Sequence, residues 1–353
     1  MNLEPPYAID SRGMTALVEG IPDQIDQALA ACVAHPWTLA PSRTPLLAVG
    51  AMGGSAIAAE LTAGLYADRL AVPMMVVRDY RWPACVTPET FTVLASYSGN
   101  TEETLALYRE AARRGVARAA LTTGGDLASL CQRDQVPWFK LPAGMPPRAA
   151  LFASWVPLTT LLAALGAGDD PTQAWGETIA ELRALGERCG ARVPEAQNLA
   201  KQLARSLVGR HLCVYASGML APVATRIRQQ LNENAKLPAH SAVVPELNHN
   251  EIVGWERPEA VHRHTTVLML RDREDLPENA RRLELTADYA RAQGAEVRIL
   301  EAQADGRLAR MAHLVTLGDY VSLYLAIARG VDPTPIASID QFKRRMAEAG
   351  RDA

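Results

Sequence analysis

Four ionisable side chains, each in its own short run, form a set suited to proton-transfer chemistry. Glu233 lies in the run NENAK, and His249 lies in the run LNHNEI. Arg148 follows two prolines, and Lys343 lies near the end of the sequence. A carboxylate and an imidazole exchange protons near neutral pH, and a guanidinium or an ammonium stabilises the negative charge that develops. The set therefore predicts an enzyme that moves protons.

Each member of the set also has a plain structural explanation, because most charged side chains of proteins lie exposed on the surface. Glu233 could be a solvated helix residue, and Lys343 could belong to a basic helix face shared with the two arginines after it. One other imidazole and two carboxylates nearby compete for the same roles: His240, Glu246 and Glu251. The prediction therefore depends on the four residues acting together, and only the HN context favours His249 over His240.

Two loops rich in glycine and hydroxyl groups each follow a predicted strand and open a predicted helix. The first loop, residues 50–55, reads GAMGGS, and the second, residues 96–104, reads SYSGNTEET. Free backbone N–H groups and the positive end of the helix dipole favour an anion at such helix starts, and glycine lets a ligand approach the backbone closely. Both loops are therefore candidate anion-binding sites.

The second loop is the more specific signal. Three Ser and Thr hydroxyls surround Gly99, those of Ser96, Ser98 and Thr101, whereas one is enough to cap a helix. The first loop has neither the G-x-G-x-x-G spacing of a dinucleotide-binding turn nor the GKS or GKT of a P-loop. A single glycine turn of that kind is more often only a tight connection between a strand and a helix.

Short apolar runs alternate with segments of helical periodicity, which is typical of parallel βαβ units. In the first half the pattern predicts strands at 45–50, 73–77, 91–95 and 116–122, with helices at 53–66 and 101–114. After a helical stretch at 169–202, it predicts strands at 211–216, 264–270 and 295–301, with helices at 220–236, 278–293, 308–329 and 336–349. We expect an α/β fold of two doubly wound parallel-sheet domains, residues 1–168 and 169–353.

The composition excludes several classes of protein. A net charge of −3 and 5% aromatic residues over 353 residues argue against a nucleic-acid-binding protein. The five cysteines are dispersed, so we expect no zinc site and a reducing, cytoplasmic location. The start MNLEPPYAID has no apolar signal-peptide core. Residues 149–168 are uncharged and long enough to cross a bilayer, but they contain Pro157 and favour a buried helix. We expect no metal, cofactor, nucleic acid or membrane partner.

Several of these runs match the motifs of known families. SYSGNTEET after a strand resembles the phosphosugar-binding loop of the sugar isomerase (SIS) domain family, although Ala51 stands where we expect a glycine in the first loop. The runs PPRAA, NENAK and LNHNEI and the terminal helix resemble the bifunctional phosphoglucose/phosphomannose isomerase family over nearly the whole chain. The resemblance implies two SIS-type domains with flavodoxin-like or Rossmann-like sheets, and a homodimer in which the active-site histidine comes from the neighbouring subunit.

The resemblance also implies a reaction. Glucose 6-phosphate and mannose 6-phosphate would be interconverted with fructose 6-phosphate through a cis-enediol, without a metal. Glu233 would move the proton between C1 and C2, and Arg148 would stabilise the enediolate. His249 would open the sugar ring with help from Lys343. In this family a small hydroxyl residue is associated with tolerance of both C2 epimers, and Thr334 is the nearest candidate.

The same resemblance assigns the loops. The hydroxyls of Ser96, Ser98 and Thr101 would hold the phosphate, and Gly54 and Ser55 would lie near the sugar.

Two alternatives stay open. One is a non-catalytic SIS sensor that binds a sugar phosphate, which would not need Glu233, His249 or Lys343. Such a sensor would usually carry a DNA-binding extension, and no basic segment of that kind precedes residue 44. The other is a different phosphosugar isomerase or a deaminase. Glutamine-dependent enzymes of that group need an N-terminal cysteine, and Cys32 does not occupy that position.

Overall fold

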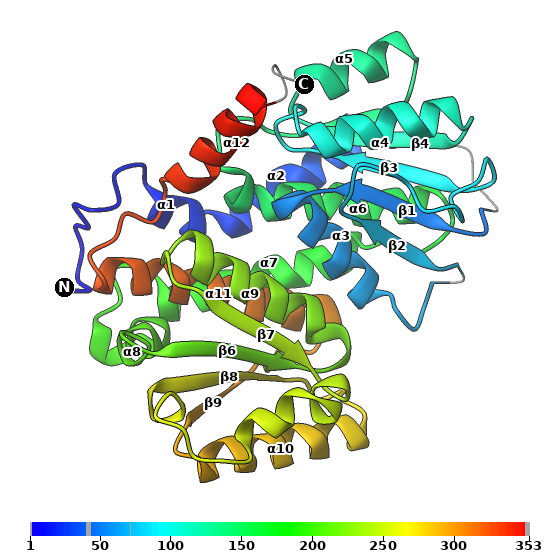
Figure 1. Ribbon diagram of the computed structural model, residues 1–353. Coiled ribbons are helices and arrows are strands. Elements are labelled where there is room, and N and C mark those ends of the chain that lie inside the picture. The colour runs from blue at the N-terminus through cyan, green and yellow to red at the C-terminus, as the bar shows by residue number, and fades with distance from the viewer. Residues whose placement is uncertain (1, 40–43, 71, 350–353) are drawn as a thin grey trace.

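The computed structural model describes residues 2–39, 44–70 and 72–349, and it contains two parallel β-sheets (Figure 1). The first sheet has the strand order β2-β1-β3-β4-β5, and the second has the order β7-β6-β8-β9. The strands are β1 (Leu47–Ala51), β2 (Met74–Val77), β3 (Phe91–Ala95), β4 (Ala117–Thr122), β5 (Trp138–Lys140), β6 (His211–Ala216), β7 (Ala239–Val243), β8 (Thr265–Arg271) and β9 (Glu296–Glu301). Every neighbouring pair is parallel, which confirms the predicted fold class.

Helices cover the faces of both sheets. In the first half they are α1 (Met14–Glu19), α2 (Ile21–Ala34), α3 (Gly53–Leu65), α4 (Glu102–Arg113), α5 (Gly125–Arg133) and α6 (Leu151–Ala164). In the second half they are α7 (Thr172–Cys189), α8 (Leu199–Ser206), α9 (Ala221–Glu233), α10 (Pro277–Ala292), α11 (Arg307–Ala328) and α12 (Ala337–Ala349). Because both faces are covered, β1 and β3 are buried along their whole length and are apolar apart from Thr92.

The predicted strands agree with the structure to within two residues at each end, and those at 91–95 and 211–216 coincide with β3 and β6. The prediction of one helical stretch at 169–202 is wrong, because α7 ends at Cys189 and α8 begins only at Leu199. Gly190 leaves the helix in an extended conformation, and Asn198 caps the next helix by accepting a hydrogen bond from the Lys201 amide at 3.0 Å. No pattern recognised in the sequence predicted α1, α2, α5, β5 or β7.

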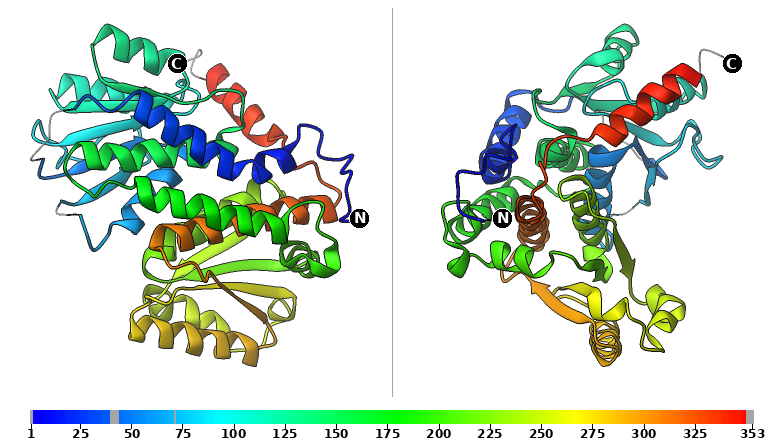
Figure 2. Two further views of the ribbon diagram at one scale, coloured as in Figure 1. Left: turned by 180° about the vertical axis from the view of Figure 1, so that it is seen from behind. Right: turned by 60° about the vertical axis from the view of Figure 1, so that its left-hand side comes forward.

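A layer of helices joins the two sheets. Helix α7 packs against both α2 and α11 in this layer (Figure 2). Among the described residues, α11 is the one helix that is long and apolar enough to cross a membrane, and the apolar stretch concerned is entirely buried in the fold. Helix α6 is also buried, which confirms the prediction for residues 149–168. One hydrophobic core contains side chains from both halves, so the domain boundary after residue 168 stays a prediction.

In each sheet the strand order reverses at one place, between β1 and β3 in the first sheet and between β6 and β8 in the second. Ligands of open α/β sheets bind at the carboxyl ends of the strands at such a switch point. The loops after β1 and β3 are the two glycine- and hydroxyl-rich loops of the sequence analysis. The fold therefore brings both predicted anion-binding loops to the first switch point.

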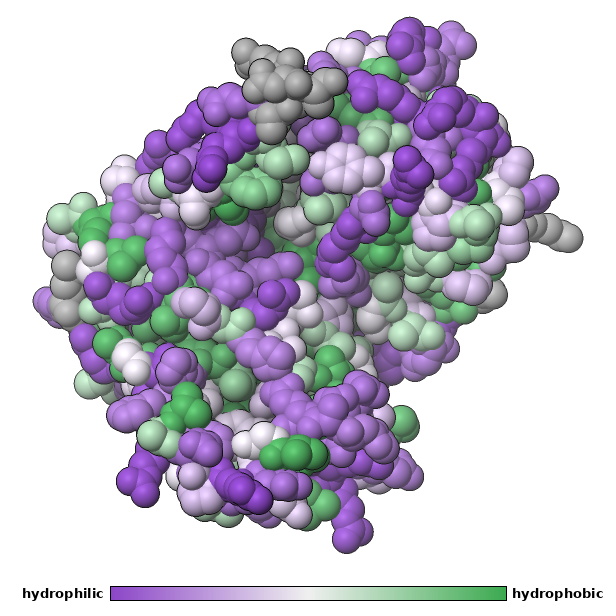
Figure 3. All heavy atoms as spheres, viewed as in Figure 1, coloured by the Kyte–Doolittle hydropathy of each residue, from purple (hydrophilic) through white to green (hydrophobic). Residues whose placement is uncertain are grey.

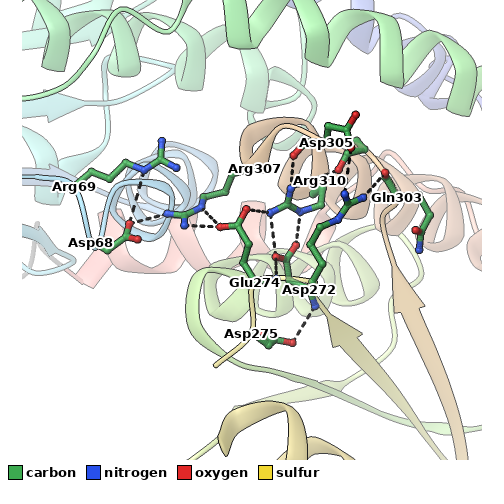
Figure 4. A network of polar contacts seen from close by, with 11 residues as sticks. Asp68, Arg69, Asp272, Glu274, Asp275, Gln303, Asp305, Arg307 and Arg310 are labelled. Carbon is green, nitrogen blue, oxygen red and sulfur yellow. Dashed lines mark hydrogen bonds and ion pairs between the residues drawn. The ribbon is translucent and has the colours of Figure 1, made fainter. Parts of the chain in front are cut away.

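The second switch point is occupied by ion pairs between acidic and basic side chains. Asp272 and Glu274 follow β8 and form ion pairs with arginines of α11 (Figure 4). The Arg310 guanidinium is buried, with Nε 2.7 Å from Asp272 Oδ2, and Arg307 reaches Asp68 beyond the end of α3 at 2.7 Å. The arginines at this position are already paired with carboxylates, so the geometry favours the first switch point for an anion.

Candidate active site

The loop after β3 is held in shape by its own hydroxyls. Ser96 Oγ lies 2.8 Å from Thr101 Oγ1 and accepts a hydrogen bond from the Gly99 amide at 3.1 Å. Ser98 Oγ accepts one from the Asn100 amide at 3.2 Å. Gly99 has φ +74°, and a Cβ there would lie 1.8 Å from the Gly124 carbonyl oxygen, so only glycine fits.

The starts of α3 and α4 lie at the same edge of the first sheet, because β1 and β3 are neighbours. Met52 and Thr101 precede these helices, and neither side chain forms a capping hydrogen bond. The first-turn N–H groups of both helices therefore stay available to a ligand. Gly53 turns the chain with φ +49°. This arrangement suits a phosphate, which would receive backbone N–H groups and hydroxyls from two loops.

The first loop also touches the segment that carries Arg148. A Cβ at Gly54 would lie 2.9 Å from the Pro147 carbonyl oxygen and 3.5 Å from the Arg148 Cα. Glycine at this position therefore allows the loop to pack directly against the start of the short 3-10 helix Pro147–Ala150. As a result, the predicted anion site and the predicted arginine are neighbours.

The guanidinium of Arg148 is held on several sides. Its Nε donates a hydrogen bond to Asn234 Oδ1 at 2.7 Å, and its Nη2 donates to the carbonyl oxygens of Pro333 and Thr334 at 2.7 and 2.8 Å. Its Nη1 lies 3.7 Å from Glu233 Oε2. Burial lowers the pKa of Arg148, whereas the nearby charge of Glu233 raises it. The structure thus brings together two of the four predicted catalytic residues.

Behind this pair lies a closed ring of buried hydrogen bonds. Arg226 Nη2 donates to the Arg148 carbonyl oxygen and to Asp319 Oδ2, both at 2.8 Å. Asn234 Nδ2 donates to Ser322 Oγ at 3.0 Å, and Ser322 Oγ donates to the Asp319 carbonyl oxygen at 2.9 Å. Burial raises the pKa of Asp319, and Arg226 opposes that effect. The ring joins the 3-10 helix Pro147–Ala150, which precedes α6, to α9 and α11 and fixes both the main chain and the side chain of Arg148.

The other members of this ring were not among the predicted site residues: Asn234, Arg226, Asp319 and Ser322. One signal was available, because Asp319 is an acidic residue in the long apolar α11 and needs a partner when it is buried. A second signal was the helical spacing of Arg226 and Glu233, which places both on one side of α9.

The structure does not bring His249 or Lys343 to this pair. His249 ends a short 3-10 helix and is exposed, and its side chain has no hydrogen bond or ion pair among the described residues. Lys343 is exposed on α12. The competitors are engaged elsewhere, since Glu251 pairs with His240 at 2.8 Å and bonds Tyr215, and Glu246 accepts a hydrogen bond from Asn250.

A hollow of about 520 Å³ borders Arg148 and runs beneath the start of α12. Thr334 lines it, and its buried hydroxyl has no hydrogen-bond partner among the described side chains. In the space-filling view, a recess with hydrophilic residues at its rim opens between α12 and the end of α9 (Figure 3). A larger hollow of about 900 Å³ lies between α7, α11 and β9, and none of the predicted site residues lines it.

Comparisons with known proteins identify the family. Residues 196–346 match the family model of the bacterial phospho-glucose isomerase C-terminal SIS domain. A bifunctional phosphoglucose/phosphomannose isomerase of Caldicellulosiruptor bescii is 41% identical over 298 residues, which is 84% of this chain and 88% of the relative. The chain belongs to this isomerase family. A second member, from Aquifex aeolicus, is 31% identical over 84% of this chain and 88% of its own length.

The fold of this family member is shared with more distant proteins. The crystal structure of tagatose-6-phosphate ketose/aldose isomerase from Escherichia coli superposes with a TM-score of 0.71 at 15% sequence identity, covering 93% of this chain and 96% of that chain. This likeness concerns the fold alone. Together with the match to the SIS family model, it confirms the predicted SIS-type architecture.

Proposed function

We propose that this chain is an aldose–ketose isomerase that interconverts glucose 6-phosphate and mannose 6-phosphate with fructose 6-phosphate. The observation that carries the proposal is the pair Arg148–Glu233, whose charged groups lie 3.7 Å apart beside the two loops at the first switch point, with Arg148 fixed by a buried ring of hydrogen bonds. A sensor would need the loops but not this pair. Membership of the isomerase family agrees with the catalytic alternative.

The carboxylate of Glu233 supplies the base for the open-chain sugar. It takes the proton from C2 of the aldose, and the electron pair of that C–H bond forms the C1–C2 double bond while O1 becomes negative. The proton then returns to C1, the hydroxyl proton of O2 moves to O1, and the ketose results. Every atom of the substrate is retained in the product. The step needs no metal, and we expect activity to survive treatment with a chelator.

Arg148 acts where the negative charge develops. Nε and Nη2 are occupied by protein acceptors, so Nη1, the nitrogen that faces Glu233, is the one available to the enediolate oxygens. A donor held in place before the reaction stabilises such charge without reorganisation. The phosphate, bound by Ser96, Ser98 and Thr101, contributes binding energy that positions the reacting carbons.

Ring opening is assigned to His249 and Lys343, and the exposed positions of both agree with a site shared between subunits. In this proposal His249 of the partner subunit completes the site. Apolar side chains recur at helical spacing on the exposed α12, namely Ile339, Phe342 and Met346, and they offer a face for a second copy. We place the resulting homodimer in the cytoplasm.

A coupled assay tests the proposed reaction. Purified protein treated with EDTA is given fructose 6-phosphate, and glucose 6-phosphate and mannose 6-phosphate are measured by separate coupling enzymes. The proposal predicts that both products form. Binding of fructose 6-phosphate without either product would overturn it in favour of the sensor, and formation of glucose 6-phosphate alone would remove the mannose branch.

A further inference from the structure

Lys236 lies where two segments of the candidate site meet. It follows α9 and has φ +52°, a left-handed conformation that few residues other than glycine adopt. Its Nζ donates hydrogen bonds to the carbonyl oxygens of Glu233 at 2.5 Å, Asn234 at 3.5 Å and Pro333 at 3.1 Å. One ammonium therefore binds the end of α9 and the loop that leads into α12.

The Pro333 carbonyl oxygen is also an acceptor for Arg148, whose Nη2 lies 2.7 Å away. Lys236 and Arg148 thus share one acceptor, and a shift of this carbonyl would change the position of both cations. Because Arg148 Nη1 faces Glu233, such a shift would alter the distance between the base and the guanidinium. Small displacements of this kind reduce catalysis strongly.

We propose that Lys236 is a positioning residue for the isomerisation: its ammonium fixes the Pro333 carbonyl and the end of α9, and so holds Arg148 and Glu233 in the arrangement that proton transfer requires. This inference rests on the proposed function, in which Glu233 is the base. Lys236 acts through these neighbours and does not itself touch the reacting carbons.

The charges around Lys236 make the inference testable by pH. Lys236 is exposed as a residue, but desolvation of its ammonium and the positive charge of Arg148 lower its pKa to about 8, and Asp332 and Glu233 act in the opposite direction. As the pH rises through this value the ammonium becomes a neutral amine, which is a weaker donor to carbonyl oxygens. We expect kcat to fall with a midpoint near this pKa.

The contribution of Lys236 to the free energy of unfolding changes with pH in the opposite direction to kcat. The unfolded chain keeps the proton of Lys236 up to its ordinary pKa of 10.5, whereas the folded chain releases it near pH 8. Between these values the unfolded state binds more protons, so the contribution of Lys236 to folding becomes more favourable as the pH rises. The activity is therefore expected to fall over a range in which Lys236 does not destabilise the fold.

The experiment compares wild type with Lys236→Met and Lys236→Arg. At pH 7 we expect Lys236→Met to lower kcat by about 10- to 100-fold, the range for misplaced catalytic groups, with KM for fructose 6-phosphate nearly unchanged. The alkaline fall in kcat near pH 8 should be absent from Lys236→Met. In Lys236→Arg, whose guanidinium stays charged, kcat at pH 7 should be largely retained and the fall should move to higher pH.

Lys201→Met is the matched control. Lys201 is buried and donates to the carbonyl oxygens of Ala191 and Val193, each at 2.8 Å, so it also holds backbone carbonyls but makes no contact with the candidate site. We expect this variant to lose stability and to keep its kcat at 25 °C.

The outcomes separate the two proposals. Wild-type kcat in Lys236→Met, or an alkaline fall near pH 8 that persists in that variant, would overturn the positioning role. If the variants fold poorly, the wild-type profile still decides, because a flat kcat between pH 7 and 9.5 contradicts the proposal. Absence of isomerase activity from the wild type would instead overturn the proposed function.

Discussion

Arg226 gives the sharpest test of the ring behind the active site. Its guanidinium is buried and bonds both Asp319 and the Arg148 carbonyl oxygen at 2.8 Å. Arg226→Met leaves the Asp319 carboxylate buried without its partner. Such a change lowers the free energy of unfolding by about 3–5 kcal/mol, a large part of the total stability of a domain.

The double variant Arg226→Met/Asp319→Leu separates stability from catalysis. Removing both charges of a buried pair is often nearly neutral, so we expect the free energy of unfolding to return to within about 2 kcal/mol of wild type. The Arg148 carbonyl oxygen would still lack its donor. We therefore expect kcat with fructose 6-phosphate to stay about 10- to 100-fold below wild type.

The assay measures urea unfolding and steady-state kinetics on the same preparations. Arg310→Met is the control, because Arg310 is a buried arginine of α11 that pairs with Asp272 and Glu274 at the second switch point, away from the ring (Figure 4). It should lose stability and keep its kcat. A double variant with wild-type kcat would refute the claim that the ring positions Arg148.

Three further predictions concern the loop after β3 and one histidine. Ser96→Ala should raise KM for fructose 6-phosphate about 10- to 100-fold, the loss of a charge-assisted hydrogen bond, and an unchanged KM would remove Ser96 from the phosphate site. Gly99→Ala should destabilise the fold by several kcal/mol, since its Cβ would lie 1.8 Å from the Gly124 carbonyl oxygen. By contrast Gly176→Ala, in a helix with open space around it, should be neutral or stabilising in the same thermal melts. Burial lowers the pKa of His313, which contacts Glu181, below its ordinary 6.5. Its contribution to stability is thus present above pH 6.5 and is lost as the pH falls, so a His313→Gln variant should show a weaker acid dependence in urea unfolding.

The strands and loops of the site were predictable because their signals are local. A five-residue apolar run such as β3 followed by SYSGNTEET determines both the strand and the helix start after it. The three-residue β5 carries too few residues for such a signal, and β7 is polar at several positions. The break after Cys189 was visible in Gly190 and Pro194, residues that end helices.

The arrangement of the site depended on contacts that no local pattern contains. Arg148 and Asn234 are 86 residues apart, and Arg226 and Asp319 are 93 apart, so their pairing follows from the packing of α6, α9 and α11. The sequence allowed Arg148 and Glu233 to be grouped by chemistry, whereas their distance of 3.7 Å came only from the structure. The roles of His249 and Lys343 stay predictions.

The most direct test of the central claim, that Glu233 is the proton-transferring base, is solvent exchange at the sugar. Fructose 6-phosphate is incubated in D2O with wild type, Glu233→Gln or the control Glu246→Gln, and deuterium at C1 and C2 is followed by NMR. We expect wild type and Glu246→Gln to incorporate deuterium, and Glu233→Gln to incorporate none while still binding the sugar in calorimetry. Exchange by Glu233→Gln at the wild-type rate would contradict the account.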